Sequence, residues 1–224
     1  MKISKNLIQH FKPQIETLEF LQKNIFSKIP KEFKSYYAFG GGTALSLCYF
    51  QHRLSFDIDI FVYDVQLMNY INPQIFFDDI EDEVDDYMCM SHQINMITKS
   101  GTYVNILSVK NLNPNKKDVL ELNNNSILVE TPEEIITKKI IFRKNENKVR
   151  DLFDIAFAIH NDNNFLNKLL ETNYITKNDL EVLYEAIKRV DEKEIKEELK
   201  IISPFKKIDN ILTVIETAIK NSNI

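Results

Sequence analysis

The pattern of hydrophobic and polar positions divides the chain into a first part that contains strands and a second part that is almost entirely helical. Apolar residues at helical spacing predict a first helix from about Asn6 to Ile29, which Pro30 closes. From Pro132 onwards the pattern is helical nearly to the end. The β-prone segments all precede it: Tyr36–Phe39, Ile58–Tyr63, Met88–Thr98, Thr102–Val109 and Ile127–Val129, with Lys99–Gly101 as the turn between the third and fourth.

The remaining segments complete an α/β (α+β) fold. Residues Thr43–Phe50 read as a helix, Asp78–Asp86 as the solvated end of a helix begun near Pro73, and Asn111–Asn125 as polar turns. Thr131 is the expected cap of the helix that starts at Pro132. We therefore expect a small mixed β-sheet flanked by helices as a catalytic core in residues 1–130. A helical C-terminal region in residues 131–224 is expected to complete the active site.

Composition narrows the class of protein. Only 4 glycines occur in 224 residues, and three of them are adjacent at positions 40–42, which makes this cluster the first candidate for a functional turn. The formal net charge of −5 argues against a general nucleic-acid coat but permits a local basic patch. Cys48 and Cys89 have no metal-ligand spacing. With no secretory leader pattern and no apolar run of about 20 residues, we expect a cytoplasmic protein without a membrane partner.

Two carboxylates at the start of a hydrophobic strand form the candidate metal site. In Phe56-Asp57-Ile58-Asp59-Ile60, side chains alternate, so Asp57 and Asp59 share one face while Ile58 enters the core. Such a pair suits a hard cation, Mg²⁺ or Mn²⁺. Upstream, a strand, a glycine turn and a helix expose backbone N–H groups that suit a triphosphate, which makes Gly41, Gly42 and Thr43 candidate nucleotide-binding residues.

The first helix of the second part has an inward-facing pair of cations. At helical spacing Lys139 shares the face of Ile140, Arg143 follows one turn later, and Lys138 is expected nearer solvent. Asp151 and Asp154 lie one turn apart on the next, very apolar helix, so they need partners such as Lys139, Arg143 or Arg150. Two interpretations stay open: a structural ion-pair network, or a site in which Lys139 binds triphosphate and an aspartate orients it.

A family resemblance joins the two motifs. The segment Gly-Gly-Thr…His-Arg-Leu-Ser-Phe-Asp-Ile-Asp-Ile-Phe resembles the signature of the nucleotidyltransferase superfamily, and more narrowly the AbiEii toxins, which include the MenT toxins. Residues 131–156 resemble the downstream pattern of that family, a helix with a lysine followed by an Arg-Asp segment. The resemblance assigns Lys139 as the matching lysine and favours Asp151, and then Asp154, as site residues.

The resemblance implies a function as well as a site. Such an enzyme transfers a nucleotide from a nucleoside triphosphate to an RNA acceptor, with tRNA as the example, and has a cognate antitoxin. Arg53 is expected to touch phosphate or to pair with an aspartate, Ser55 to contact the nucleotide, and Arg143 to join the nucleotide-binding set. Asn105 stands where many relatives have a third acid. Two other interpretations remain: transfer to a small molecule or protein, and a catalytically dead nucleotide-binding regulator.

Overall fold

The computed structural model describes residues 9–75, 80–112, 116–123, 125–143, 148–201, 205–206 and 208–222. Its internal contacts divide the chain into two units. The first unit contains residues 1–48 and 55–131, and the second contains residues 132–224 together with the short segment Tyr49–Leu54. This segment therefore belongs to the second unit although the residues before and after it in sequence belong to the first, and we call it the excursion.

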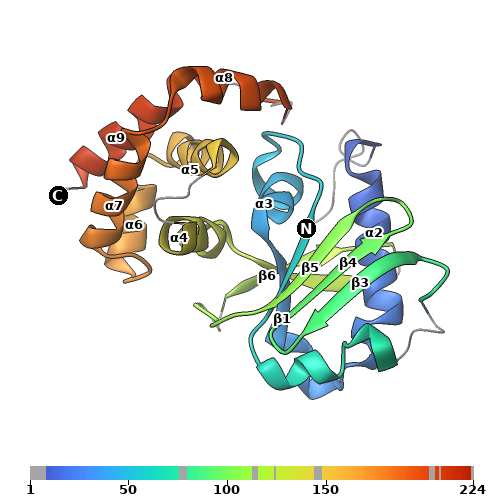
Figure 1. Ribbon diagram of the computed structural model, residues 1–224. Coiled ribbons are helices and arrows are strands. Elements are labelled where there is room, and N and C mark those ends of the chain that lie inside the picture. The colour runs from blue at the N-terminus through green and yellow to red at the C-terminus, as the bar shows by residue number, and fades with distance from the viewer. Residues whose placement is uncertain are drawn as a thin grey trace. The chain divides into compact units, whose positions relative to one another are not determined.

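The first unit is built on a mixed sheet of seven strands in the order β3-β4-β5-β2-β1-β7-β6 (Figure 1). The central strand β2 is antiparallel to β1 and parallel to β5, while β1 and β7 are parallel and the outer pairs are antiparallel. The strands are β1 (Tyr37–Gly40), β2 (Ile58–Val62), β3 (Val84–Met90), β4 (Gln93–Thr98), β5 (Tyr103–Ser108), β6 (Lys117–Glu121) and β7 (Ser126–Glu130).

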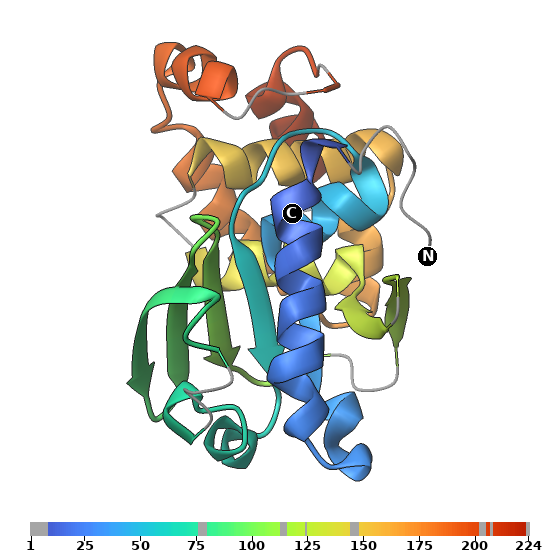
Figure 2. The ribbon, with the colours of Figure 1, turned by 90° about the vertical axis from the view of Figure 1, so that its right-hand side faces the viewer.

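One long helix covers a face of this sheet. Helix α2 (Lys12–Asn24) has a proline in its first turn and buries Leu18 and Leu21 completely. Figure 2 shows it running across the sheet in front of the strands. The turns η1 (Phe26–Lys28) and η2 (Lys31–Tyr36) then lead into β1. After β1 the chain forms α3 (Gly41–Ala44), which continues as the π-helical segment η3 (Leu45–Phe50).

The described residues of the second unit form helices joined by turns and irregular segments, with no strand among them, and the unit is centred on α5 (Val149–Asn161). Ten of the eleven residues from Val149 to Ile159 of α5, all except Arg150, are buried, because α4, α6, α8 and α9 all contact this helix. Burial on every side explains why its sequence is apolar around the whole helix. The other helices are α4 (Pro132–Arg143), α6 (Phe165–Glu171), α7 (Lys177–Ile187), α8 (Glu192–Ile201) and α9 (Ile211–Asn221).

The predicted fold class is confirmed, with three local corrections. The segment predicted as one strand from Met88 to Thr98 is two strands, because Ser91 and His92 form a hairpin turn between β3 and β4. The polar segment 111–125 contains β6, an edge strand that tolerates polar residues because only one side is paired.

The third correction concerns the helix expected from Pro73 through the acidic run. In its described part, Pro73–Ile75 form only one 3₁₀ turn (η5), and Val84 already begins β3. Residues 76–79 of that expectation lie outside the described residues. Asp85 and Asp86 are exposed on β3, an edge strand, where charge opposes pairing with another sheet. In the part of the chain that the structure describes, no helix is long and apolar enough to span a membrane.

Candidate active site

Two carboxylates stand at the beginning of the central strand. Ile58, Ile60 and Val62 of β2 are completely buried, whereas Asp59 between them is half-buried on the opposite face. Asp57 directly precedes the strand and is also half-buried. The alternation expected from the sequence is present. The two candidate metal ligands therefore lie on the side of β2 that is partly exposed, opposite its buried isoleucine and valine side chains.

The glycine turn lies against Asp59. Gly40 pairs with Asp59 across β1 and β2, and Gly41 opens helix α3 in the left-handed region, with φ +69°. A Cβ atom at Gly41 would overlap the Asp59 carboxylate and lie only 2.9 Å from Asp59 Cβ. Glycine is therefore needed here for two reasons, its backbone conformation and the close approach of the acid.

A set of hydrogen bonds fixes the loop that leads into Asp57. The buried hydroxyl of Thr43 donates to the backbone carbonyl of Asp57 at 2.5 Å and lies 2.8 Å from Ser55 Oγ. Gln14 of α2 donates to the carbonyl of Phe56 at 3.1 Å. Thr43 and Ser55, predicted as nucleotide contacts, are thus placed together beside the first carboxylate. Gln14 was missed, although a polar residue in line with Leu18 and Leu21 of an amphipathic helix was the available signal.

Asn105 occupies the strand position beside Asp59. The two residues are register partners on β5 and β2, and Asn105 Nδ2 donates to Asp59 Oδ1 at 3.1 Å. Asn95 is the next partner across the sheet, on β4. An amide therefore stands beside Asp59 on the neighbouring strand and holds the second carboxylate.

The donor set fits one hard divalent cation. Among the described residues, no group of three or more His, Cys, Asp or Glu side chains is arranged to hold a metal ion. The oxygen donors available to a cation are the carboxylates of Asp57 and Asp59, with the Asn105 amide next to Asp59. Carboxylate and amide oxygens suit Mg²⁺ or Mn²⁺ rather than a thiophilic metal. Because Gly41 has no Cβ atom, the Asp59 carboxylate can lie close to the turn.

A further acid beside the turn was not predicted. Glu130, the last residue of β7, is completely buried, and the Tyr63 hydroxyl donates to its Oε1 at 2.7 Å. A Cβ atom at Gly40 would lie 2.6 Å from Glu130 Oε2, so glycine at this position also makes room for the acid. The signal was an acidic residue directly after the strand Ile127–Val129, in front of a helix cap.

In the second unit, Asp154 is the centre of a buried ionic network. Its carboxylate accepts from Arg53 Nε and Nη2 at 2.7 and 2.8 Å, lies 2.7 Å from His52 Nε2 and pairs with Lys139 Nζ at 3.1 Å. Burial alone would raise the pKa of Asp154, but the charges of Arg53 and Lys139 outweigh it and hold that pKa well below its usual range. Of the two interpretations of Arg53, the structure shows the pairing with an aspartate.

His52 takes part in this network as a neutral ring. Its imidazole is completely buried and stacks on Phe153 at a centroid distance of 5.5 Å. Burial lowers the pKa of His52, against the opposing effect of its bond to Asp154. A neutral imidazole next to a carboxylate donates its Nε2–H. Sequence reasoning had noted His52 only as part of the motif.

Lys139 connects the two predicted aspartates. Its Nζ lies 2.5 Å from Asp151 Oδ1 as well as 3.1 Å from Asp154. Asp151 is 1% exposed and its Oδ2 has no hydrogen bond among the described residues, although Arg143 Nε lies 3.8 Å away. Of the three cations named as candidate partners, Lys139 thus contacts both acids within this unit.

The expected exposures of the neighbouring cations were wrong. Lys138, expected nearer solvent, is 7% exposed and lies 3.3 Å from the buried Glu134, one turn earlier. Helix α4 is buried on more than one side, so the single inward face of a simple amphipathic helix does not apply. Arg143, expected to point inward, has a side chain that is 52% exposed, because it is the last residue of α4.

Comparison with known proteins supports the predicted resemblance. Residues 26–95 match the model of a family described as the nucleotidyl transferase AbiEii toxin of a type IV toxin–antitoxin system. These residues contain the glycine turn and both Asp57 and Asp59. The resemblance to AbiEii nucleotidyltransferases is thereby confirmed for the segment that holds the candidate metal site. No curated protein matches the chain.

A solved structure with a TM-score above 0.5 shares the fold over nearly the whole chain. MenT4, a nucleotidyltransferase toxin from Mycobacterium tuberculosis, has a TM-score of 0.56 at 11% identity, covering 94% of this chain and 83% of its own. JHP933 from Helicobacter pylori has a TM-score of 0.47 at 16% identity, covering 98% and 93%. At such low identity the likeness to MenT4 concerns the fold alone.

Proposed function

We propose that this chain, whose residues 26–95 match the AbiEii nucleotidyltransferase family, transfers the nucleotide of a nucleoside triphosphate to an RNA acceptor. Pyrophosphate is the leaving group, and tRNA is the first acceptor to test. In this proposal the protein acts as the toxin of a toxin–antitoxin pair and has a cognate antitoxin as its protein partner. The family description supports the toxin assignment. The choice of RNA as the acceptor is our own proposal.

The observation that carries the proposal is the contact between the glycine turn and the carboxylate strand. The left-handed Gly41 places the start of α3 against Asp59, while Thr43 holds the backbone of Asp57. Phosphate groups bind to backbone N–H groups at glycine turns, and a divalent cation binds to paired carboxylates. Both needs of a metal-bound triphosphate are thus met within one short stretch of the first unit.

In this proposal, Asp57 and Asp59 hold the divalent cation. When bound, the ion neutralises triphosphate charge and polarises the phosphorus that the acceptor hydroxyl attacks. Asn105 keeps one oxygen of Asp59 fixed through its 3.1 Å hydrogen bond, and Thr43 fixes the chain at Asp57. These bonds orient the two carboxylates before any ligand arrives, which is how a protein lowers the cost of reaching the reactive geometry.

Further residues of the sequence prediction enter the proposal with defined roles. Gly41 and Gly42 present backbone N–H groups to the triphosphate. Lys139 is proposed to bind phosphate, with Asp151 and Asp154 setting the direction of its side chain. Arg53 supports this set through Asp154, since its guanidinium is engaged there on two nitrogens.

The test is incubation of the full chain with each labelled nucleoside triphosphate, Mg²⁺ or Mn²⁺ and total RNA, followed by separation of RNA from small molecules. We expect label on RNA, and loss of that label for Asp57→Asn and Asp59→Asn with unchanged melting temperature. Asp86→Asn is the matched control, because Asp86 is an exposed acid on β3 of the same sheet. Label on a small molecule or protein, or turnover that survives both substitutions, would contradict the proposal.

A further inference from the structure

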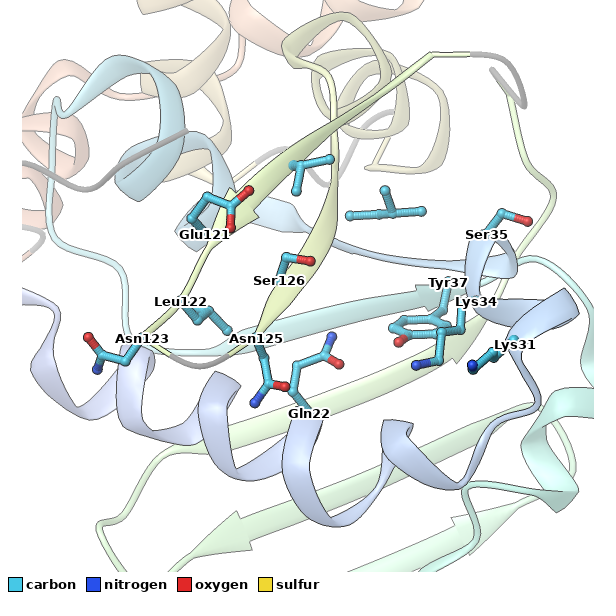
Figure 3. A pocket seen from close by; sticks show the side chains of 12 residues that line it. Gln22, Lys31, Lys34, Ser35, Tyr37, Glu121, Leu122, Asn123, Asn125 and Ser126 are labelled. Carbon is cyan, nitrogen blue, oxygen red and sulfur yellow. The ribbon is translucent and has the colours of Figure 1, made fainter.

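The first unit contains a hollow that the proposed reaction does not use. It is a groove of about 800 Å³ between the end of α2, the turn η2 and the β6–β7 hairpin (Figure 3). The groove is bordered by β1 and β7. These two strands share a single register pair, Phe39 with Val129, so they are paired over only a short length beside the groove. A volume of this size is in the range of small-ligand sites.

One end of the groove is positively charged. Lys31 and Lys34 are exposed on consecutive turns of η2 and both line the hollow, beside Ser35. Among the described residues neither lysine has an ion-pair partner. Two ammonium groups without a counter-charge favour an anionic ligand, and lysine is a common ligand of phosphate.

The floor of the groove holds a buried amide, Gln22, which lies close to the Tyr37 hydroxyl and has hydrogen-bonding capacity left for a ligand. Gln22 is 8% exposed, and its Nε2 has no hydrogen bond of normal geometry among the described residues. Figure 3 shows the amide directed into the hollow, on the side of Tyr37 and Lys34. Leaving a buried N–H group unsatisfied costs stability, so a ligand with an acceptor atom at this point would recover it.

Tyr37 supplies a second fixed polar group. Its ring is 4% exposed and stacks on Phe26 at a centroid distance of 4.5 Å, which holds the hydroxyl in place. Burial raises the pKa of Tyr37, opposed by the nearby Gln22 side chain, so the hydroxyl keeps its proton near neutral pH. A protonated hydroxyl can donate to an anionic oxygen and accept from a sugar hydroxyl.

The opposite wall is neutral or acidic and rigidly attached. The backbone N and the side-chain Nδ2 of Asn123 both donate to Glu19 of α2, at 3.3 and 2.6 Å, and so tie the hairpin to the helix. Glu121, Asn125 and Ser126 line this wall and can bond to hydroxyl groups. An apolar strip of Val119, Leu122 and Leu128 runs beside them. A ligand that is anionic throughout would be repelled by Glu121, so the anion belongs at the lysine end.

We propose that this groove binds a ribonucleotide unit, with its phosphate at Lys31 and Lys34, its sugar hydroxyls at the β6–β7 hairpin and its base against the apolar strip. The unit is either a free nucleotide or part of an RNA chain, since both present the same phosphate, sugar and base. The inference stands apart from the proposed transfer reaction, because none of these residues belongs to the metal site.

The experiment measures binding in EDTA, so that a metal-bound triphosphate cannot contribute. The full chain is titrated with fluorescent AMP and with a labelled single-stranded RNA octamer at several salt concentrations. The variants are Lys31→Gln/Lys34→Gln, Gln22→Met, which keeps the size but removes the donor, and Lys99→Gln as the control. Lys99 is an exposed lysine in the turn between β4 and β5.

We expect at least one ligand to bind, and the double lysine variant to weaken that binding about tenfold or more, with Lys99→Gln unchanged. For RNA, the slope of log affinity against log salt should fall by about 0.7 for each lysine that contacts a phosphate. Weakened RNA binding with no AMP binding assigns the groove to an RNA chain, and weakened AMP binding assigns it to a nucleotide. No binding of either ligand to the wild type, or equal effects of the groove and control variants, would overturn the inference.

Discussion

Substitution of Gly41 by alanine tests the link between the glycine turn and the carboxylate strand. Alanine in the left-handed region costs about 1–2 kcal/mol, and Gly41 has φ +69°. The new Cβ would also lie 2.8 Å from Asp59 Cγ and 2.9 Å from Asp59 Cβ, where ordinary contact begins at 3.4 Å. Rotating the Asp59 carboxylate cannot relieve the contact between the new Cβ and the Cβ of Asp59, because the Cβ of Asp59 is fixed by the backbone of β2. Asp59 must therefore shift by about 0.5 Å or more, or the turn must open.

The chain provides a matched control for the backbone strain. Gly101 has φ +78°, but a Cβ there would meet nothing within 4 Å. Gly101→Ala should therefore lose only the left-handed strain of about 1–2 kcal/mol, which lowers the melting temperature by about 2–4 °C per kcal/mol. Gly41→Ala should lose about 1–3 kcal/mol more through the clash.

Activity separates the two variants further. Displacement of a metal-binding carboxylate by a fraction of an ångström should reduce nucleotide transfer by about 10²-fold in Gly41→Ala. Gly101→Ala should retain near-normal turnover at a temperature where both variants are folded. The assays are thermal melts and label transfer to RNA under identical conditions. If Gly41→Ala transfers as well as Gly101→Ala, the contact between the turn and Asp59 has no role in the reaction.

Three predictions concern the network of the second unit. Asp154→Asn should lower the free energy of unfolding by about 3–5 kcal/mol, because it removes the anion shared by buried cations. The control Asp162→Asn changes an acid near the surface and should barely change the melting temperature. Similar melting temperatures for the two variants would disprove a structural role of Asp154. Burial lowers the pKa of His52, so below about pH 6.5 the unfolded chain binds a proton that the native chain does not, and stability should fall by up to about 1.4 kcal/mol per pH unit as the pH decreases. His52→Gln should flatten this slope in denaturant titrations between about pH 6.5 and 5, and an unchanged slope would refute the assignment. Lys139→Ala should reduce transfer by about one to two decades per folded molecule. Lys138→Ala should mainly lower stability, because it removes the ion pair of the buried Glu134 with Lys138. Equal losses of transfer in the two variants would point to a general electrostatic effect.

Features that depend on nearby residues were accessible from the sequence. The alternation of Asp57, Ile58 and Asp59 fixed which side of the strand carries the acids, and the adjacent glycines indicated the turn in front of them. The strand that carries Asn105 was predicted from its alternating pattern, and the structure puts Asn105 beside Asp59.

Features that depend on packing between distant segments were not accessible. Asp154 was expected to pair with a cation near it in sequence, yet its partners include His52 and Arg53, which precede it by 102 and 101 residues. Only the folded chain brings these segments together. Lys138 was misplaced for a related reason, since helical periodicity identifies one buried face, whereas neighbouring helices bury α4 on several. The groove of Figure 3 likewise combines a helix end, a turn and a hairpin.

The excursion Tyr49–Leu54 restricts how this chain can be cut. A fragment of residues 132–224 would contain every described helix of the second unit but lack this segment. Asp154 would lose Arg53 and His52, and the rings of Phe153 and Phe157 would lose the imidazole packed against them. Such a fragment should fail to fold when expressed alone, whereas a chain opened at an exposed surface turn such as Lys99–Gly101 keeps all of these contacts. The start of the helical part of the sequence is therefore not a place at which the chain can be cut into two independent halves.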